Sequence, residues 1–310
     1  MNRRTFIQST FASGMLMANP DLMANTPSNP LKINVFSKMF QWIEDYNTLA
    51  ETLREIGFDG ADLTVRPAGH VLPERVEEDL PKAVQALKKA KVEVPMMVTG
   101  ILKADEATER ILKTAKALGI NHYRMGWYPY DLKKDIPTQV EALRQQMKGL
   151  AVLNEKYQIS GEYQNHAGNY LGASMWDLHG ILKQINSPYL GVQYDINHAT
   201  AEASTAWETG FHLIAPFIKS LAIKDFRWIQ KDGKYIKEGC PLGEGMVNWK
   251  KYLPLVKQYN LTVPITMHYE YALGGAENGN KTLSIDRSVL VAAMKKDLAL
   301  FKNWMSEIGY

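Results

Sequence analysis

Polar and charged side chains gather where four of the predicted β-strands end. They are Glu162, Gln164 and His166; Gln193, Asp195 and His198; Lys224; and Thr266, His268 and Glu270. Side chains two residues apart in a strand share a face, so most members of each group are expected on one face. Burying such a group on the inner face of a parallel sheet costs about 1–3 kcal/mol unless it is hydrogen-bonded or used. Imidazole, carboxylate and ammonium groups move protons and imidazole and carboxylate ligate metal ions, so the clustering indicates a functional site.

Other residues of the same types are expected to have structural roles. These are the four histidines His70, His122, His179 and His212. Asp225 follows Lys224 directly and so faces away from it, which favours capping a helix or bracing a loop.

Short β-prone runs alternate with amphipathic stretches about eight times from Leu31 onward. The predicted strands are 32–36, 60–65, 93–99, 122–126, 159–166, 190–196, 220–226 and 264–271, and the predicted helices are 43–56, 75–91, 107–118, 139–157, 174–185, 205–216, 249–259 and 285–308. Strands separated by helices are parallel, and eight such units in one domain, residues 31–310, predict an α/β fold, a closed (β/α)₈ TIM barrel. A doubly wound open sheet is the rival, but no Gly-x-Gly-x-x-Gly follows the first strand. Asp232-Gly233 between two β-like runs predicts a hairpin over 227–236.

Composition narrows the class of protein. The chain has 310 residues, 45% hydrophobic and 22% charged, and its 36 Lys and Arg against 33 Asp and Glu leave a charge of +3. That charge is too small and scattered to indicate a nucleic-acid partner. The single Cys240 excludes an internal disulfide and a multi-thiolate metal site, so any metal would need N and O ligands. Beyond the first two dozen residues no apolar run reaches the roughly 18 residues that span a bilayer, so stable membrane insertion is not expected.

The N-terminus has the features of a targeting peptide. Arg3-Arg4 followed by Phe6-Ile7 and a mildly apolar stretch resembles the twin-arginine export signal, which carries folded proteins. We expect an export signal over residues 1–24, a linker over 25–30 and a periplasmic or otherwise exported mature protein. A surface amphipathic helix is the alternative, although Ser9, Thr10, Ser13 and Gly14 make a poor helix.

The order of the motifs carries a resemblance to a known family. The motifs are Gln164-Asn165-His166, Asp195-Ile196-Asn197-His198, Lys224-Asp225, Gly243-Glu244-Gly245 and Glu270. Together they resemble the xylose isomerase-like TIM-barrel superfamily, which includes sugar and sugar-phosphate isomerases and epimerases, inosose dehydratase and endonuclease IV. The resemblance implies a divalent ion held by carboxylates from strands five, six and eight and a histidine from strand seven.

The chain departs from that pattern at three positions. Gln164 stands at the strand-five Glu, Ala222 at the strand-seven His and His268 at the strand-eight Glu, with Glu270 one pleat further on. Asp195 alone is unchanged. The ligand set that the resemblance implies is therefore Gln164, Asp195, His268 and Glu270, with mixed O and N donors for Mn²⁺, Mg²⁺ or Zn²⁺ and less negative charge than usual.

The resemblance implies a metal-dependent sugar isomerase or epimerase that abstracts a proton next to a carbonyl of a small carbohydrate, and the N-terminal signal makes it an exported one. The catalytic candidates are Glu162, His166, His198, Lys224 and Glu270. Lys224 would stabilise an enolate oxygen, or else form an ion pair with Asp195 or Glu270. The aromatic residues Trp42, Trp127, Tyr128, Tyr130 and Trp228 suit stacking on a sugar or loop packing.

The sequence leaves two alternatives to that activity open and disfavours a third. A lyase or hydrolase acting on keto-sugar glycosides would use the same removal of an α-proton, and a catalytically altered barrel would only bind carbohydrate. An endonuclease is disfavoured because that branch needs more His and Glu ligands and a basic DNA face. The oligomeric state is left open.

Overall fold

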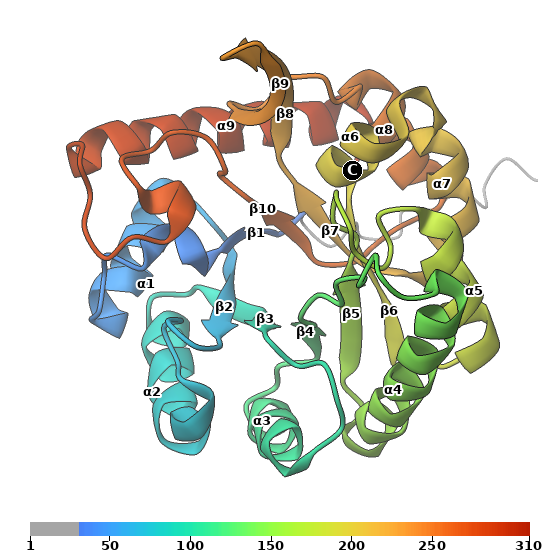
Figure 1. Ribbon diagram of the computed structural model, residues 1–310. Helices are drawn as coiled ribbons and strands as arrows, with labels where there is room; N and C mark the ends of the chain where they lie inside the picture. The colour runs from blue at the N-terminus through green and yellow to red at the C-terminus, as the bar shows by residue number, and fades with distance from the viewer. Residues whose placement is uncertain (1–30) are drawn as a thin grey trace, which may run out of the picture. The chain divides into compact units, whose positions relative to one another are not determined.

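Eight parallel strands close into a barrel in the computed structural model (Figure 1). They are β1 (Ile33–Phe36), β2 (Gly60–Val65), β3 (Glu93–Thr99), β4 (His122–Arg124), β5 (Ser160–Gln164), β6 (Leu190–Asp195), β7 (Ile218–Ile223) and β10 (Ile265–Met267). The closed order is β1-β10-β7-β6-β5-β4-β3-β2, so the predicted (β/α)₈ barrel is confirmed. The structure describes residues 31–310, and the predicted export signal over 1–24 and linker over 25–30 lie outside them.

Helices follow the strands and surround the barrel (Figure 1). They are α1 (Tyr46–Ile56), α2 (Val76–Lys89), α3 (Glu106–Ala117), α4 (Ile136–Tyr157), α5 (Met175–Ile185), α6 (Ile196–Ala203), α7 (Trp207–Ile214), α8 (Trp249–Gln258) and α9 (Arg287–Glu307). Helices α1 and α3 begin on aspartate caps: Asp45 accepts from Thr48 N at 2.8 Å and Asp105 from Thr108 N at 2.9 Å. None of the helices within 31–310 is long and apolar enough to span a membrane.

Five predicted boundaries at the carboxyl ends of strands are wrong. The predicted strands 122–126 and 159–166 end two residues earlier, at Arg124 and Gln164. Strand six ends at Asp195 because its side chain caps α6, which begins at Ile196 rather than near residue 205. The predicted strand 220–226 is divided, since β7 ends at Ile223 and the next strand begins at Asp225. The predicted strand 264–271 stops at Met267. All five differences lie where the polar side chains leave the barrel.

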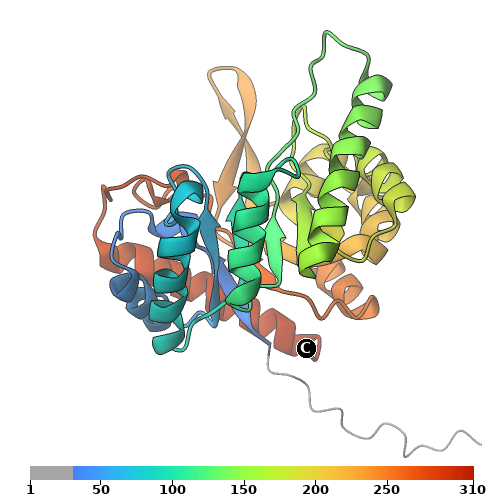
Figure 2. The same cartoon turned by 90° about the horizontal axis from the view of Figure 1, so that it is seen from below.

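The predicted hairpin is confirmed and is longer than expected. Strands β8 (Asp225–Lys231) and β9 (Lys234–Cys240) pair antiparallel around Asp232-Gly233, whose φ values of 50° and 72° suit a tight hairpin turn. Figure 2 shows this hairpin projecting from the barrel. Its base packs closely against the segment after β10. The approach is so close that a Cβ on Gly239 would come within 1.9 Å of the Glu270 carbonyl oxygen.

Asp225 fixes the base of the hairpin from the other side. Its carboxylate accepts hydrogen bonds from the backbone N–H groups of Gly243, at 3.0 Å, and Val247, at 3.2 Å, and from Trp249 Nε1 at 2.9 Å. A Cβ on Gly245 would lie 2.1 Å from Asp225 Oδ1, so only glycine fits there. The predicted loop-bracing role of Asp225 is confirmed, and the backbone of Gly243-Glu244-Gly245 lies around its carboxylate.

Candidate functional site

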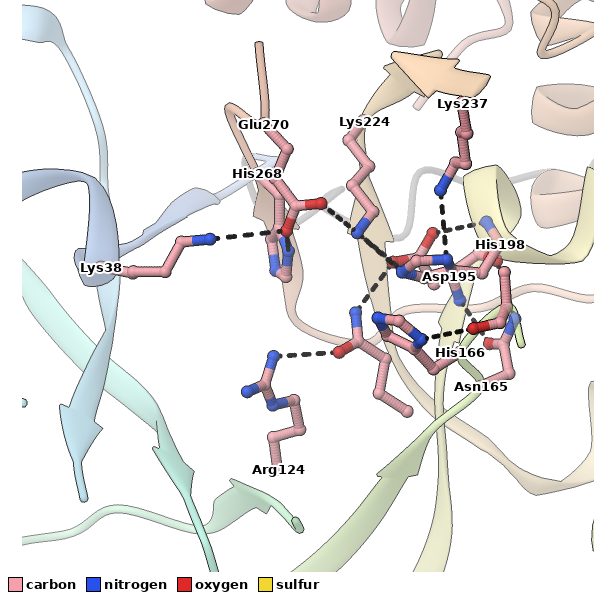
Figure 3. A network of polar contacts seen from close by, with 12 residues as sticks. Lys38, Arg124, Asn165, His166, Asp195, His198, Lys224, Lys237, His268 and Glu270 are labelled. Carbon is pink, nitrogen blue, oxygen red and sulfur yellow. Dashed lines mark hydrogen bonds and ion pairs between the residues drawn. The ribbon is translucent and has the colours of Figure 1, made fainter. Parts of the chain in front are cut away.

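The ammonium group of Lys224 is the centre of the polar cluster (Figure 3). Lys224 follows the last residue of β7 and is only 4% exposed. Its Nζ lies 3.1 Å from Asp195 Oδ2, 2.8 Å from Glu270 Oε2 and 2.9 Å from His198 Nε2. Groups from the ends of β6, β7 and β10 therefore converge on one buried positive charge at the mouth of the barrel.

Asp195 is held rigidly because it ends a strand and begins a helix at once. Its Oδ1 accepts from His198 N at 3.1 Å and its Oδ2 accepts from Gln164 Nε2 at 2.8 Å. The side chain of Asn165 pairs with its backbone, accepting from Asp195 N at 2.7 Å and donating to Asp195 O at 2.9 Å. The carboxylate thus has a fixed direction toward Lys224.

Gln164 links this cluster to a second cation. Its Oε1 accepts from Arg124 Nη1 at 2.9 Å while its Nε2 donates to Asp195. An amide can donate and accept at once, which a glutamate at this position could not do while ionised. The glutamine is therefore used as a bridge between Asp195 and Arg124.

The ion pairs decide the protonation states of the central groups. Burial opposes the charge on Lys224, but the carboxylates of Asp195 and Glu270 outweigh it and raise the pKa of the amine above its ordinary value. For Glu270 burial works in the opposite direction, and the Lys224 ammonium overcomes it, so that the pKa of Glu270 falls well below its usual range. Lys224 is charged and Glu270 ionised at neutral pH.

The three histidines predicted at the site all lie at the mouth, in different environments. His198 is buried between two lysines, with Nε2 next to Lys224 and Nδ1 3.3 Å from Lys237 Nζ, and burial together with these charges holds its pKa well below normal. The ring of His166 lies 4.0 Å from that of His198, centroid to centroid. His166 Nδ1 lies 2.8 Å from the carbonyl oxygen of Ala167, and burial lowers its pKa.

His268 differs from the other two because neither of its ring nitrogens forms a hydrogen bond within the part of the chain that the structure describes. It is buried, burial lowers its pKa to about 4, and neither ring nitrogen has a hydrogen-bond partner among residues 31–310. Its Nδ1 lies 3.8 Å from Glu270 Oε1, and its ring packs 4.8 Å from that of Phe36. His268 therefore lines the site as an uncharged side chain.

Glu162 is not brought to the mouth with the others. Its carboxylate lies 2.6 Å from His122 Nδ1 and accepts from Ser220 Oγ, and it is fully buried. The shared face with Gln164 is correct, but two residues along a strand correspond to about 6.6 Å of depth. Glu162 therefore sits one layer deeper in the barrel, and it gives His122 the structural partner expected of that histidine.

The site also contains groups that the sequence analysis missed. They are Lys38, Arg124 and Lys237. Arg124 ends β4 in line with the other strand ends, so its position in the predicted strand was a usable signal. Lys237 reaches the site from the hairpin, and burial, together with the charge of Lys224, lowers its pKa to about 8. Nothing in the local sequence around Lys237 marks it.

The aromatic side chains proposed for sugar stacking mostly pack against the loops. Trp42 Nε1 donates to Met39 O at 3.1 Å, and Tyr130 OH donates to Asp177 at 2.7 Å. Trp127 lies between the ring of His166, at 4.6 Å, and the Arg124 guanidinium, at 4.7 Å. Tyr128 donates to the Leu102 carbonyl. Only Trp228, on the hairpin and 44% exposed, presents a large open surface among the five.

The residues expected to hold a divalent ion do not fit one. Asp195 and Glu270 both form ion pairs with Lys224, Gln164 is neutral, and the ammonium stands among the oxygens that would ligate the ion. A divalent cation there would face Lys224 at close range with too little negative charge to compensate. Within the described residues no group of three or more His, Cys, Asp or Glu side chains is arranged to hold a metal.

Solved structures share this fold at low sequence identity. D-psicose 3-epimerase from Clostridium cellulolyticum H10, solved with D-tagatose, is 14% identical, with a TM-score of 0.68 over 89% of this chain and 99% of its own. The 3-keto-D-glucoside 4-epimerase from E. coli is 11% identical, with a TM-score of 0.66 over 88% and 99%. A xylose isomerase-like TIM barrel protein from Mycobacterium smegmatis in complex with magnesium is 14% identical, with a TM-score of 0.60 over 87% and 97%.

Sequence comparison gives the family directly. No curated protein matches the chain. The profile described as xylose isomerase-like TIM barrel matches residues 50–287, which take in the strands from β2 to β10, the hairpin included, and the site residues from Arg124 to Glu270. The chain belongs to the xylose isomerase-like TIM barrel family.

Proposed function

We propose that this chain is a sugar isomerase or epimerase that removes the proton next to a carbonyl, with the Lys224 ammonium stabilising the negative charge that develops on the oxygen. The observation that carries the proposal is the position of Lys224, buried and charged between Asp195 and Glu270 beside neutral histidines. Membership of the family supports sugar chemistry, and the fold neighbours include two sugar epimerases.

Lys224 supplies what enolate chemistry needs most. A fixed cation in a site of low dielectric stabilises an oxyanion strongly and needs no reorganisation when the charge appears. Asp195 and Glu270 keep the amine protonated and hold it in place. Because the ammonium pairs with Asp195 and Glu270, two of the residues expected to bind a metal ion, every step of the proposed reaction uses the chain's own residues.

His166 is the base in this proposal. If its Nδ1–H donates to the Ala167 carbonyl, Nε2 keeps its lone pair, and the lowered pKa leaves the ring neutral at pH 7. The lone pair of His198 Nε2 is directed at Lys224 instead. Glu270 is the weaker candidate, because Lys224 depresses its pKa and with it the basicity of the carboxylate. Glu270 and Asp195 therefore orient Lys224, and His198 assists them.

Elimination from a keto-sugar glycoside is the second candidate, and Lys237 favours it. Loss of a glycosidic oxygen after α-proton removal needs an acid on the leaving group. Lys237 enters from the hairpin, contacts His198 at 3.3 Å and has a pKa near 8, so it can give up a proton at neutral pH. Release of a free sugar from such a glycoside would distinguish this reaction from isomerisation.

Proton exchange in heavy water tests the proposed activity. We expect the purified protein, kept in a chelator, to exchange a carbon-bound hydrogen next to the carbonyl of at least one sugar in a panel of ketoses, aldoses and keto-glycosides, as measured by proton NMR. Metal analysis of the same sample should find less than one equivalent of any divalent ion. Exchange that stops in chelator and returns with Mn²⁺ would contradict the assignment of the cation role to Lys224. Sugar binding without exchange would indicate a barrel that only binds carbohydrate.

We also propose that the chain acts outside the cytoplasm, and the support is Arg3-Arg4 with the weakly apolar stretch behind it. Protein isolated from the native host is expected to begin near residue 25. N-terminal sequencing checks this, and a sequence that starts at Met1 or Asn2 in the mature protein would contradict it.

A further inference from the structure

Three cations surround one aromatic ring beside the Lys224 cluster. The ring is that of Phe36, at the end of β1, and the distances to its centroid are 5.6 Å for Lys38 Nζ, 5.5 Å for Arg66 Cζ and 5.1 Å for Arg124 Cζ. Arg66 follows β2 and Arg124 ends β4, so all three lie at the carboxyl ends of strands. This is the end of the barrel at which a substrate binds.

Arg124 carries a buried charge without a counter-ion. It is 3% exposed, its one side-chain hydrogen-bond partner is the neutral amide of Gln164, and its Nε has no partner. No carboxylate within residues 31–310 comes within 4.0 Å of its guanidinium. Burial lowers its pKa to about 9 and the charge of Arg66 adds to the effect, while the carboxylates of Glu270, Asp62 and Asp195, none of them in contact with it, offset only part of it. Such a group destabilises the empty site unless something negative pairs with it.

The two neighbouring cations, Arg66 and Lys38, bring no free carboxylate that could pair with Arg124. Arg66 forms no ion pair with any described residue, and burial lowers its pKa. Lys38 reaches one carboxylate, Glu270, at 3.9 Å, and that carboxylate is already paired with Lys224 at 2.8 Å. Burial lowers the pKa of Lys38, and Lys224, Arg124 and Arg66 all add to that effect. Stacking on Phe36 and Trp127 is weaker than a desolvated ion pair and does not neutralise the charge.

A further unused donor points in the same direction. Trp127 Nε1 is buried without a hydrogen-bond partner in the described part of the chain, and Trp127 packs against Arg124. Arg124 is linked to Lys224 through Gln164 and Asp195, by contacts of 2.9, 2.8 and 3.1 Å. The surplus positive charge is therefore continuous with the site of the proposed chemistry.

We propose that the substrate is an anionic sugar, one that bears a carboxylate or a phosphate ester, and that Arg124, Arg66 and Lys38 bind this anionic group around Phe36. The proposal rests on the proposed function for the sugar part and adds the substrate class. A guanidinium binds either group through two parallel hydrogen bonds, so the same three side chains suit both. The carbonyl end of such a sugar would then lie toward Lys224.

Two probes of the anion site test the proposal without knowledge of the sugar. Sodium malonate and sodium phosphate are added to the full mature chain, with sodium chloride at equal ionic strength as reference. We expect at least one of the two to raise the thermal midpoint over chloride, and the two arms separate the carboxylate from the phosphate. Arg66→Gln should reduce that rise by half or more, whereas Arg54→Gln, which removes one positive charge from the exposed face of α1, should leave it unchanged.

Arg124→Met separates a binding role from a structural one. Because the variant removes a buried charge that lacks a counter-ion, its thermal midpoint in chloride should equal or exceed that of the wild type, and its response to the anion should be lost. A midpoint lower by several degrees, or no anion effect on the wild type, would overturn the proposal.

Matched sugar pairs then connect the site to the chemistry. D-Glucuronate is compared with D-glucose, and D-fructose 6-phosphate with D-fructose, by calorimetry and by proton exchange. The anionic member of one pair should bind at least tenfold more tightly, and Arg66→Gln should remove that preference. Exchange on a neutral sugar that Arg66→Gln leaves unchanged would overturn this inference and keep the proposed function. Anion-dependent binding with no exchange on any sugar would support the inference and count against the proposed function.

Discussion

Lys224→Met is expected to lower kcat for proton exchange by about 100-fold or more, with a much smaller change in KM. The ammonium contributes most when the oxygen carries the charge of the enolate, and much less when it is a neutral carbonyl, so its loss affects turnover more than binding. In the variant, Asp195 and Glu270 would also face the oxygen without their cation. Steady-state kinetics of the exchange reaction give both constants.

Two further variants at this position serve as controls. Lys224→Arg keeps the charge and should retain part of the activity, limited by the larger guanidinium. Lys224→His removes the ammonium and leaves an imidazole among Asp195, Glu270 and His268, which is a set that suits a divalent ion. Calorimetry should show that this variant binds Mn²⁺ at least tenfold more tightly than the wild type does. If Lys224→Met raised KM alone, Lys224 would be a binding residue and not the oxyanion stabiliser.

The fold could be predicted from sequence because its signals are local and periodic. Val76, Leu80, Val84 and Leu87 repeat at helical spacing, and all four are buried in α2. Asp232-Gly233 between β-prone runs specified the hairpin by the turn geometry that those residues favour. Such signals depend on the neighbouring residues in the chain, so they need no knowledge of tertiary contacts.

The strand ends were harder to predict, and the reason is a competition between local structures. Asp195 continues the strand pattern of β6, yet its side chain accepts from His198 N and so starts a helix. A capping aspartate and a strand residue look alike in the sequence when both follow β-prone residues. The predicted strand 264–271 also ran too far, since Glu270 lies beyond β10 in a segment without regular secondary structure.

The composition of the candidate site was partly predictable, but its charge pattern was not. The two-residue alternation of side chains along strands grouped Gln164, Asp195, Lys224 and Glu270 correctly, because side chains at the ends of barrel strands converge. The alternation of side chains along a strand shows which face a residue is on but not how deep in the barrel it lies. Glu162 was therefore grouped with residues one layer above it. The alternation also cannot show that Lys224 reaches two carboxylates at once, since that depends on strands far apart in the sequence. Lys237 arrives from a hairpin whose direction only the tertiary structure gives.

His166→Gln is expected to abolish measurable proton exchange, while the variant still binds the sugar. Glutamine is close in size and can donate to the Ala167 carbonyl, but it offers no basic lone pair where Nε2 stands. In the wild type the base must be unprotonated, so kcat/KM should fall as pH drops through the pKa of His166. Burial and the charge of Lys224 place that pKa below the ordinary 6.5, so the decline of kcat/KM toward acid pH should have its midpoint below pH 6.5.

Glu270→Gln is the matched comparison for the identity of the base. If His166 is the base, this variant should keep a measurable rate, reduced because Lys224 loses one of its two carboxylates, and the acid limb of its pH profile should remain. If Glu270 were the base, the variant would lose exchange completely. The acid limb of the wild type would then lie below pH 4.5, because Lys224 holds the pKa of Glu270 under its usual value. The pH at which the wild-type rate declines therefore identifies the base independently of either substitution.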